Sequence, residues 1–437
     1  MRIHLNALGC RLNEAELEQW ATAFSGAGEQ IATDPADADI LVLNTCAVTR
    51  EAVRKSRQRL QKLQRANPRA KLVVSGCYSE LASETALAEL GVDLIVPNTR
   101  KDDLVSLTRS AFADVSMPQT ATLPANTALF TRNRHRAFIK IQDGCRYRCT
   151  FCIVTVARGA ERSRTLGDIV SEVQTLVQDE VQEIVLTGVH VGGYGADLDT
   201  NLVALVKALL DDTDIPRIRF ASVEPWDLSP GFLELFDDPR VQPHMHLPLQ
   251  SGSDTVLRRM ARRCRTADFQ ALTAALRQAV PQFNITTDVI AGFPGETEQE
   301  WAESLEFIAS QEFGHIHAFT YSEREGTRAA TLPDQVPMAT RQARSRQLHQ
   351  LGERMKAAQL ARCVGTVANV LWERGRQWSE EGNTIWAHQG YTPGYQRVCV
   401  RSPVDLANRI LPVRLVGIDG GKLRGVLDET CTGAHSC

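Results

Sequence analysis

Short apolar runs alternate with amphipathic helical stretches along most of the 437 residues, and this alternation limits the fold more than any other feature. In residues 1–110, three of these runs end at a cysteine: Cys10, Cys46 and Cys77. Strands that alternate with helices form a parallel sheet covered on both faces, so we expect an N-terminal parallel α/β domain here. Ligands of such sheets lie beyond the carboxyl ends of the strands, where the three cysteines should come together.

The alternation continues through residues 132–362, where six apolar runs are separated by helical stretches. Repeated strand–helix units favour a complete or partial α/β barrel, and the six runs correspond to a partial (β/α)6 barrel. The chemistry of such barrels lies at the carboxyl ends of their strands. Residues 363–437 instead hold short strands punctuated by Gly, Pro and Asn, which favours a small antiparallel β-barrel. Residues 111–131 are rich in small residues and proline, and we expect a linker there. The fold class is therefore α/β, with three domains.

The composition is that of a globular protein, with 43% hydrophobic residues, 23% charged residues and a formal net charge of −3. This charge gives no overall sign of nucleic-acid binding, so any basic surface must be local. No apolar stretch is long enough to cross a membrane. The N-terminus, MRIHLNALGC, lacks the apolar region of a signal peptide. We therefore expect a cytoplasmic protein that has no membrane partner.

Three of the 11 cysteines, Cys145, Cys149 and Cys152, form a CxxxCxxC motif after the first central strand. In the cytoplasm, grouped cysteines bind metal or do chemistry more often than they form disulfides. Structural zinc sites are normally closed by four ligands, and no fourth cysteine lies near. A 4Fe–4S cluster tolerates three protein thiolates when another molecule binds the fourth iron, so the motif favours such a cluster. Five other cysteines are expected to be inert thiols: Cys264, Cys363, Cys399, Cys431 and Cys437.

With the aromatic Phe151 before its last cysteine, the motif resembles the signature of radical S-adenosylmethionine (SAM) enzymes. Further segments resemble the methylthiotransferase family over nearly the whole chain: LGCRLNEAELE, NTCAVTREAVRKSRQ, SGCY, ARGAERSR, VLTGVHVGGYG, LQSGSDTVLRRMARR, DVIAGFPGET and YSEREGTRAA. The resemblance implies two 4Fe–4S clusters, held by an N-terminal triplet and a central triplet: Cys10, Cys46 and Cys77, and Cys145, Cys149 and Cys152. It also implies an electron-donor protein of the flavodoxin or ferredoxin type.

In that superfamily, the amino and carboxylate groups of SAM chelate the open iron, and one electron from the cluster cleaves the cofactor to yield a 5′-deoxyadenosyl radical. By resemblance, the N-terminal triplet holds the cluster that takes part in supplying sulfur. No catalytic side chain is expected beyond the clusters, because an unactivated aromatic C–H is not acidic enough for acid–base chemistry. Matching positions suggest the residues that contact SAM: Phe151, Gly188, Glu224, Gln250, Asp288 and Ile290.

The substrate implied by the resemblance is RNA. The C-terminal barrel is similar to the TRAM-type RNA-binding domain of the family, and basic residues gather at the predicted active face. Arginine at such density suits phosphates. The expected RNA contacts are Arg54, Arg57, Arg158, Arg162 and Arg164.

Three branches of the family differ in substrate: isopentenyladenosine in tRNA, an aspartate of a ribosomal protein, and threonylcarbamoyladenosine in tRNA. The segments NTCAVTREAVRKSRQ, RGAERSR and LTGVHVGGYG most resemble the third branch. The resemblance thus implies methylthiolation of C2 of N6-threonylcarbamoyladenosine at position 37 of tRNA. That branch usually has Pro-Tyr before Arg-Gly, where this chain has Val156-Ala157. A non-enzymatic alternative is an RNA-binding protein whose cysteines hold zinc.

Overall fold

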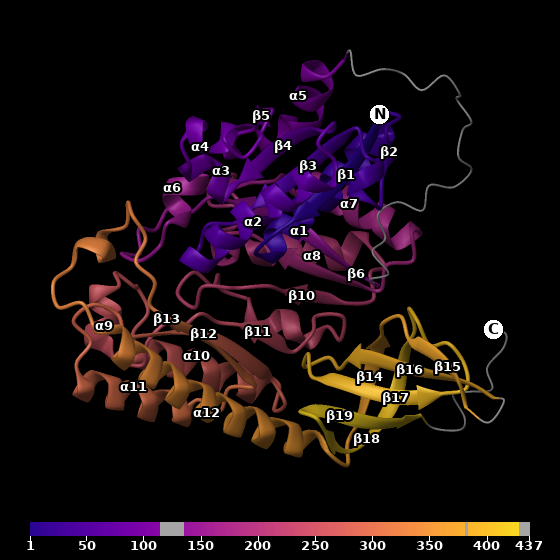
Figure 1. Ribbon diagram of the computed structural model, residues 1–437. Coiled ribbons are helices and arrows are strands. Elements are labelled where there is room, and N and C mark those ends of the chain that lie inside the picture. Colours follow the sequence, from indigo (N-terminus) through magenta and orange to yellow (C-terminus); the bar gives the residue numbers. More distant parts are fainter. Residues whose placement is uncertain (114–134, 381–382, 428–437) are drawn as a thin grey trace. The chain divides into compact units, whose positions relative to one another are not determined.

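The computed structural model describes residues 1–113, 135–380 and 383–427 (Figure 1). Most of the expected linker at 111–131 lies outside the described residues, as do Cys431 and Cys437. The chain forms two compact units. Their segments are Met1–Arg132, Asp143–Arg162 and Ser322–Thr331 for the first, and Asn133–Gln142, Ser163–Tyr321 and Leu332–Cys437 for the second. The domain boundaries given by the sequence stay predictions.

The first unit is built on a five-stranded parallel sheet with strand order β2-β1-β3-β4-β5. Its strands are β1 (Arg2–Ala7), β2 (Gln30–Ile31), β3 (Ile40–Thr45), β4 (Lys71–Gly76) and β5 (Leu94–Ile95). Its helices are α1 (Arg11–Gly26), α2 (Arg50–Ala66), α3 (Cys77–Leu81), α4 (Glu84–Ala88), α5 (Leu104–Ala111) and the short α6 (Val154–Arg158). The expected parallel α/β domain is confirmed.

Helices cover both faces of this sheet because successive side chains of a strand point to opposite sides. On β3, Leu41 and Leu43 pack in one buried cluster with Leu60 of α2. Their neighbours on the strand, such as Val42, pack in the other cluster with Trp20 of α1. The sheet therefore has one hydrophobic core on each of its two faces.

The second unit contains six parallel strands that follow one another in chain order. They are β6 (Arg136–Lys140), β9 (Glu183–Thr187), β10 (Ile218–Phe220), β11 (His244–His246), β12 (Asn284–Ala291) and β13 (His315–Thr320). Bridges Ile218↔Val241 and Ser222↔His246 join the first three strands to the last three. The helices are α7 (Leu166–Gln178), α8 (Leu202–Asp212), α9 (Asp254–Arg259), α10 (Thr266–Ala279), α11 (Glu298–Ser310) and α12 (Met338–Cys363). This arrangement is the expected partial barrel.

The C-terminal strands of the same unit form a six-stranded sheet of order β14-β18-β19-β17-β16-β15, and a further β14–β16 pairing closes it. They are β14 (Val367–Trp372), β15 (Arg376–Glu380), β16 (Asn383–Tyr391), β17 (Arg397–Ser402), β18 (Ile410–Asp419) and β19 (Lys422–Leu427). All pairs are antiparallel except β17–β19. The sequence did not indicate β15, whose RQWSE stretch carries no apolar run.

A buried charge cluster joins the two barrels of the second unit. Glu183, which is fully buried, accepts hydrogen bonds from Arg136 (2.6 Å) and Arg219 (3.0 Å). Arg219 also donates to the backbone oxygen of Pro393 in the C-terminal barrel, at 2.9 Å. Burial acts to raise the pKa of Glu183, but the arginines lower it to about 2. Among the described residues, no helix is both long and apolar enough to span a membrane.

Candidate iron–sulfur centre

The N-terminal triplet lies at one edge of the parallel sheet, as the sequence predicted. Cys46 and Cys77 directly follow β3 and β4, and Cys10 stands three residues after β1. These strands are neighbours in the sheet. Burial raises the pKa of the Cys46 thiol to about 11, and Cys10 and Cys77 act in the same direction. A thiol with a raised pKa is a poor nucleophile unless a metal ion binds it. The three cysteines of the N-terminal triplet therefore fit the role of metal ligands better than that of a catalytic nucleophile.

Two glycines let these cysteine loops approach closely. Gly9 has φ +102°, and a Cβ atom there would lie 2.6 Å from the Sγ of Cys46. Gly76 has φ +104°, and its Cβ would lie 2.3 Å from the backbone oxygen of Thr45. Side chains are excluded at both positions by steric overlap as well as by the left-handed backbone. The loops thus form a cradle around the thiols, which is consistent with a bound cluster.

The central triplet lies in a loop of the same unit. Cys145 donates its backbone N–H to Gly159 (3.1 Å), and Cys152 donates to Cys149 (3.0 Å), so the loop folds into a compact turn. Gly144 has φ +71°, and a Cβ there would lie 1.9 Å from the backbone oxygen of Ala160. All three thiols are half-buried. The backbone therefore holds three sulfur donors together and leaves them accessible.

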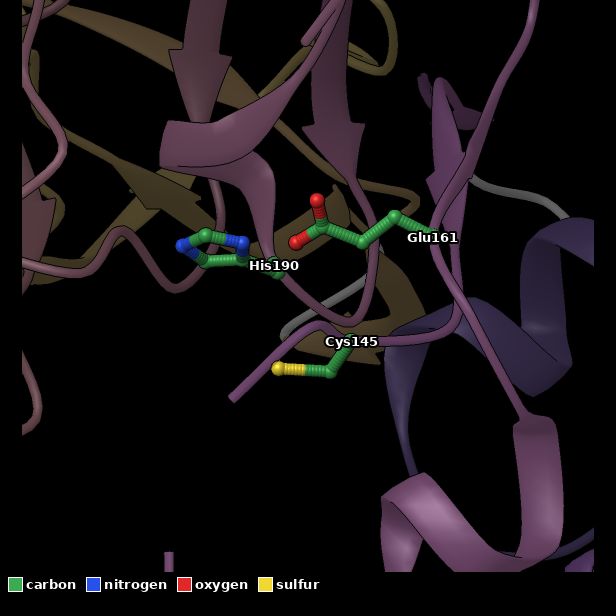
Figure 2. Close-up of side chains that lie close together, drawn as sticks. All are labelled: Cys145, Glu161 and His190. Atoms are coloured by element: carbon green, nitrogen blue, oxygen red, sulfur yellow. The ribbon is translucent and has the colours of Figure 1, made fainter. Parts of the chain in front are cut away.

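Glu161 is a neighbour of this triplet that the sequence did not single out. Its carboxylate and the thiol of Cys145 lie within 4.8 Å of each other (Figure 2). Arg146 forms an ion pair with Glu161 at 3.3 Å. Glu161 stands between two arginines in the segment ARGAERSR. Because this segment is basic, its sequence did not indicate that it contains an acidic residue close to the triplet.

Arg158 is buried, with 3% of its surface exposed, so its expected contact with RNA is wrong. Its Nη1 lies 2.9 Å from Glu16 Oε1 and 2.9 Å from Asp143 Oδ1. Its Nη2 donates to Asn13 at 2.7 Å. Burial acts to lower the pKa of Arg158, but Glu16 and Asp143 hold it well above its usual value. The guanidinium is thus a structural cation.

The charges around Arg158 are balanced. Lys101 donates to Glu16 at 2.6 Å and to Asn44 at 3.2 Å, so two buried cations face two buried anions. Asn13 in turn donates to the backbone oxygens of Leu8 (2.6 Å) and Thr45 (3.1 Å), which precede Cys10 and Cys46. Because Asp143 precedes Cys145 by two residues, the network connects the loops of both triplets.

The other arginines expected to bind RNA differ in their surroundings. Arg54 and Arg57 are both exposed on α2, and Arg54 forms an ion pair with Glu51 of the same helix at 2.6 Å. Arg162 is exposed and donates weakly to backbone oxygens. Arg164, in the second unit, is half-buried against Glu172. RNA contact by these four residues stays a prediction.

Five of the six residues expected to contact SAM lie on or shortly after strands of the second unit, and Phe151 lies in the first unit. Gly188 follows β9, Glu224 follows β10 and Gln250 follows β11, while Asp288 and Ile290 are on β12. Gln250 has φ +73°, and its backbone bonds to Asp288 (2.8 Å) and Ile290 (2.9 Å). The strand register therefore brings these three residues together.

Two histidines beside these positions were missed. Fully buried His190 lies 2.7 Å from Asp227 and 3.8 Å from Glu224, whose pKa is raised by burial. His246 lies 3.2 Å from Asp288. Only spatial proximity signals these pairs, because their members come from different strand–loop units.

Comparisons with known proteins agree with this architecture. Residues 139–308 match the radical SAM superfamily, and residues 2–97 match a family described as uncharacterized protein family UPF0004. The radical SAM methyltransferase TsrM from Kitasatospora setae has the same fold, with a TM-score of 0.57 at 13% identity, covering 75% of this chain and 77% of that one. A six-stranded parallel barrel with a CxxxCxxC loop defines a radical SAM enzyme.

Relatives of similar length identify the family of radical SAM enzymes to which the chain belongs. The chain is 34% identical to the threonylcarbamoyladenosine tRNA methylthiotransferase MtaB of Bacillus subtilis, over 95% of this chain and 93% of that one. It is 32% identical to the tRNA-2-methylthio-N(6)-dimethylallyladenosine synthase of Chloroflexus aurantiacus, over 98% and 92%. The protein belongs to the tRNA methylthiotransferase family of radical SAM enzymes. Enzymes of this family use SAM and two 4Fe–4S clusters, which disagrees with the zinc alternative.

Proposed function

We propose that the protein methylthiolates C2 of N6-threonylcarbamoyladenosine at position 37 of tRNA. The observation that carries this proposal is the full-length similarity to the threonylcarbamoyladenosine enzyme of Bacillus subtilis. A second relative of the same name, from Thermotoga maritima, is 33% identical over 85% of this chain and 86% of that one. The segment LTGVHVGGYG, which contains buried His190, supports the same branch.

The six cysteines of the two triplets would hold the clusters. When bound, the clusters and SAM supply the radical chemistry and the sulfur that an aromatic C–H requires. The chain's own residues position and shield them. The Arg158 network fixes the loops of both triplets, and Gly9 and Gly76 allow close approach at the N-terminal triplet. The residues that would contact SAM are Phe151, Gly188, Glu224, Gln250, Asp288 and Ile290.

The electron donor would be a protein of the flavodoxin or ferredoxin type, and the reaction would take place in the cytoplasm. The C-terminal barrel would bind the tRNA, as its β-structure allows. The domains would be 1–110, 132–362 and 363–437, with a linker at 111–131.

Mass spectrometry of nucleosides from total tRNA tests this proposal. We expect that deletion of the gene removes 2-methylthio-N6-threonylcarbamoyladenosine, and that the wild-type gene restores it while a gene with Cys149→Ala does not. Unchanged levels of this nucleoside in the deletion strain would refute the assignment.

One second function has a specific observation in its favour, namely the similarity to the dimethylallyladenosine enzyme of Chloroflexus aurantiacus. Loss of the 2-methylthio derivative of isopentenyladenosine in the same digests would assign that substrate instead. A mass shift of a ribosomal protein between the two strains would assign the third branch.

A further inference from the structure

Helix α2 forms one wall of an arginine-rich pocket in the first unit, with a volume of about 440 Å³. The other wall is Arg324, from the segment Ser322–Thr331. We call this feature the arginine pocket. Its lining residues are Arg50, Val53, Arg54, Arg57, Gln58, Gln61 and Arg324. Four guanidinium groups and two amides thus surround one concavity, and no acidic residue lines it.

The positive charge of the pocket is only partly neutralised. Arg50 pairs with Glu323 at 3.2 Å and Arg54 with Glu51 at 2.6 Å, but both are exposed pairs, which hold little free energy. The Nε of Arg324 is buried and has no hydrogen-bond partner among the described residues. Burial and the neighbouring Arg50 lower the pKa of Arg324. An anion in the pocket would reduce the repulsion between Arg50 and Arg324, and it would accept a hydrogen bond from the Nε of Arg324.

The pocket is fixed in place relative to a cysteine of the N-terminal triplet. Buried Ser56, on α2, donates to the backbone oxygen of Cys46 at 2.8 Å and accepts from its N–H at 3.1 Å. Arg57 is the next residue on the helix. An anion held by these arginines would therefore lie at a defined place beside the loop that carries Cys46.

We infer that the arginine pocket binds a backbone phosphate of the tRNA close to the nucleotide that is modified. This inference rests on the proposed function and identifies where that substrate is held. Guanidinium groups bind phosphate through paired, charge-assisted hydrogen bonds. Such contacts position a nucleic acid without reading its sequence. The pocket therefore acts on the affinity for tRNA and not on the choice of base.

The test compares tRNA binding by the double variant R57Q/R324Q with that of R65Q, at the exposed other end of α2 and outside the pocket. Binding of fluorescein-labelled, unmodified tRNA transcript to the cluster-loaded protein is followed by anisotropy over a salt series. For the double variant we expect Kd to rise on the order of tenfold, and the slope of log K against log salt to fall by roughly 1 to 2. For R65Q both quantities stay near the wild-type values.

Two further measurements make the result decisive. The iron content and absorption spectrum of the double variant should equal those of the wild type, which separates lost binding from lost folding. Competition with inorganic phosphate and pyrophosphate separates a backbone site from a site for a free anion. Two outcomes would overturn the inference. In the first, millimolar pyrophosphate displaces tRNA from the wild type, although the double variant binds tRNA as tightly as the wild type does. In the second, R65Q loses as much affinity for tRNA as the double variant.

The steady-state parameters distinguish this inference from the proposed function. We expect R57Q/R324Q to raise KM for tRNA and leave kcat and the identity of the product nucleoside unchanged. A wild-type enzyme that makes a different methylthio nucleoside would refute the proposed substrate and leave the phosphate site standing. A fall in kcat with unchanged KM would refute the phosphate site alone.

Discussion

Arg158 and Glu16 form a buried ion pair at 2.9 Å although they are 142 residues apart in the sequence. The same Nη1 atom lies 2.9 Å from Asp143, which precedes the central cysteine triplet. The pair thus connects the helix after Cys10 to the loop of Cys145. Loss of one partner would leave an uncompensated charge inside the protein.

We therefore expect Arg158→Gln to destabilise the first unit by about 3–5 kcal/mol, because Glu16 and Asp143 would remain buried without their shared cation. Guanidinium chloride unfolding followed by circular dichroism measures this change. Arg162→Gln is the control, since Arg162 is exposed and should change stability by less than about 0.5 kcal/mol. Equal stability of the two variants would contradict the structural role of Arg158.

The close approach of the cysteine loops gives a second prediction. In Gly9→Ala the new methyl group would overlap Cys46 Sγ, so we expect loss of the N-terminal cluster and retention of the central one. Gly28→Ala is a matched control: Gly28 also has positive φ, +83°, but no atom lies within 4 Å of its Cβ position. It should cost about 1 kcal/mol of backbone strain and keep both clusters. Iron and sulfide analysis of anaerobic protein checks this, and full iron loading of Gly9→Ala would show that the cradle is not required.

Separate roles for the two triplets predict separable activities. Cys46→Ala should abolish methylthiolation while SAM cleavage to 5′-deoxyadenosine continues, because the central triplet is intact. Cys149→Ala should abolish both reactions. Cys264→Ala, which removes a buried thiol outside both triplets, should keep both. Chromatographic assay of 5′-deoxyadenosine with nucleoside mass spectrometry measures the two reactions, and SAM cleavage by Cys149→Ala would contradict the assignment.

The buried Glu183 predicts how the second unit responds to acid. Its pKa is about 2 in the folded protein, below the ordinary value of 4.5, so protons bind the unfolded chain first as the pH falls. The stabilisation is complete above about pH 4.5 and is lost between about pH 4.5 and 2, and its size is about 3 kcal/mol. The free energy of unfolding measured over this range should fall less steeply in Glu183→Gln than in the wild type. Equal slopes would show that Glu183 titrates normally.

Local patterns predicted much of the fold and part of the site. Strand–helix alternation identified the parallel sheet, the six barrel strands and the positions of Cys10, Cys46 and Cys77 at the strand ends. These features follow from side chains that lie near one another in sequence, so periodicity and spacing record them. The polar strand β15 was missed, because its residues carry no apolar alternation and its pairing with β16 defines it.

The sequence by itself determined which sulfur donors are available and at which strand ends they stand. Only the tertiary structure decided which charges are exposed. Arg158 and Arg162 look alike in ARGAERSR, yet one is buried against Glu16 and the other is exposed. Arg324 and Arg57 likewise line one pocket although they are 267 positions apart in the sequence. The physical reason is that the partner of a charged group is set by long-range packing, which residue spacing along the chain does not encode.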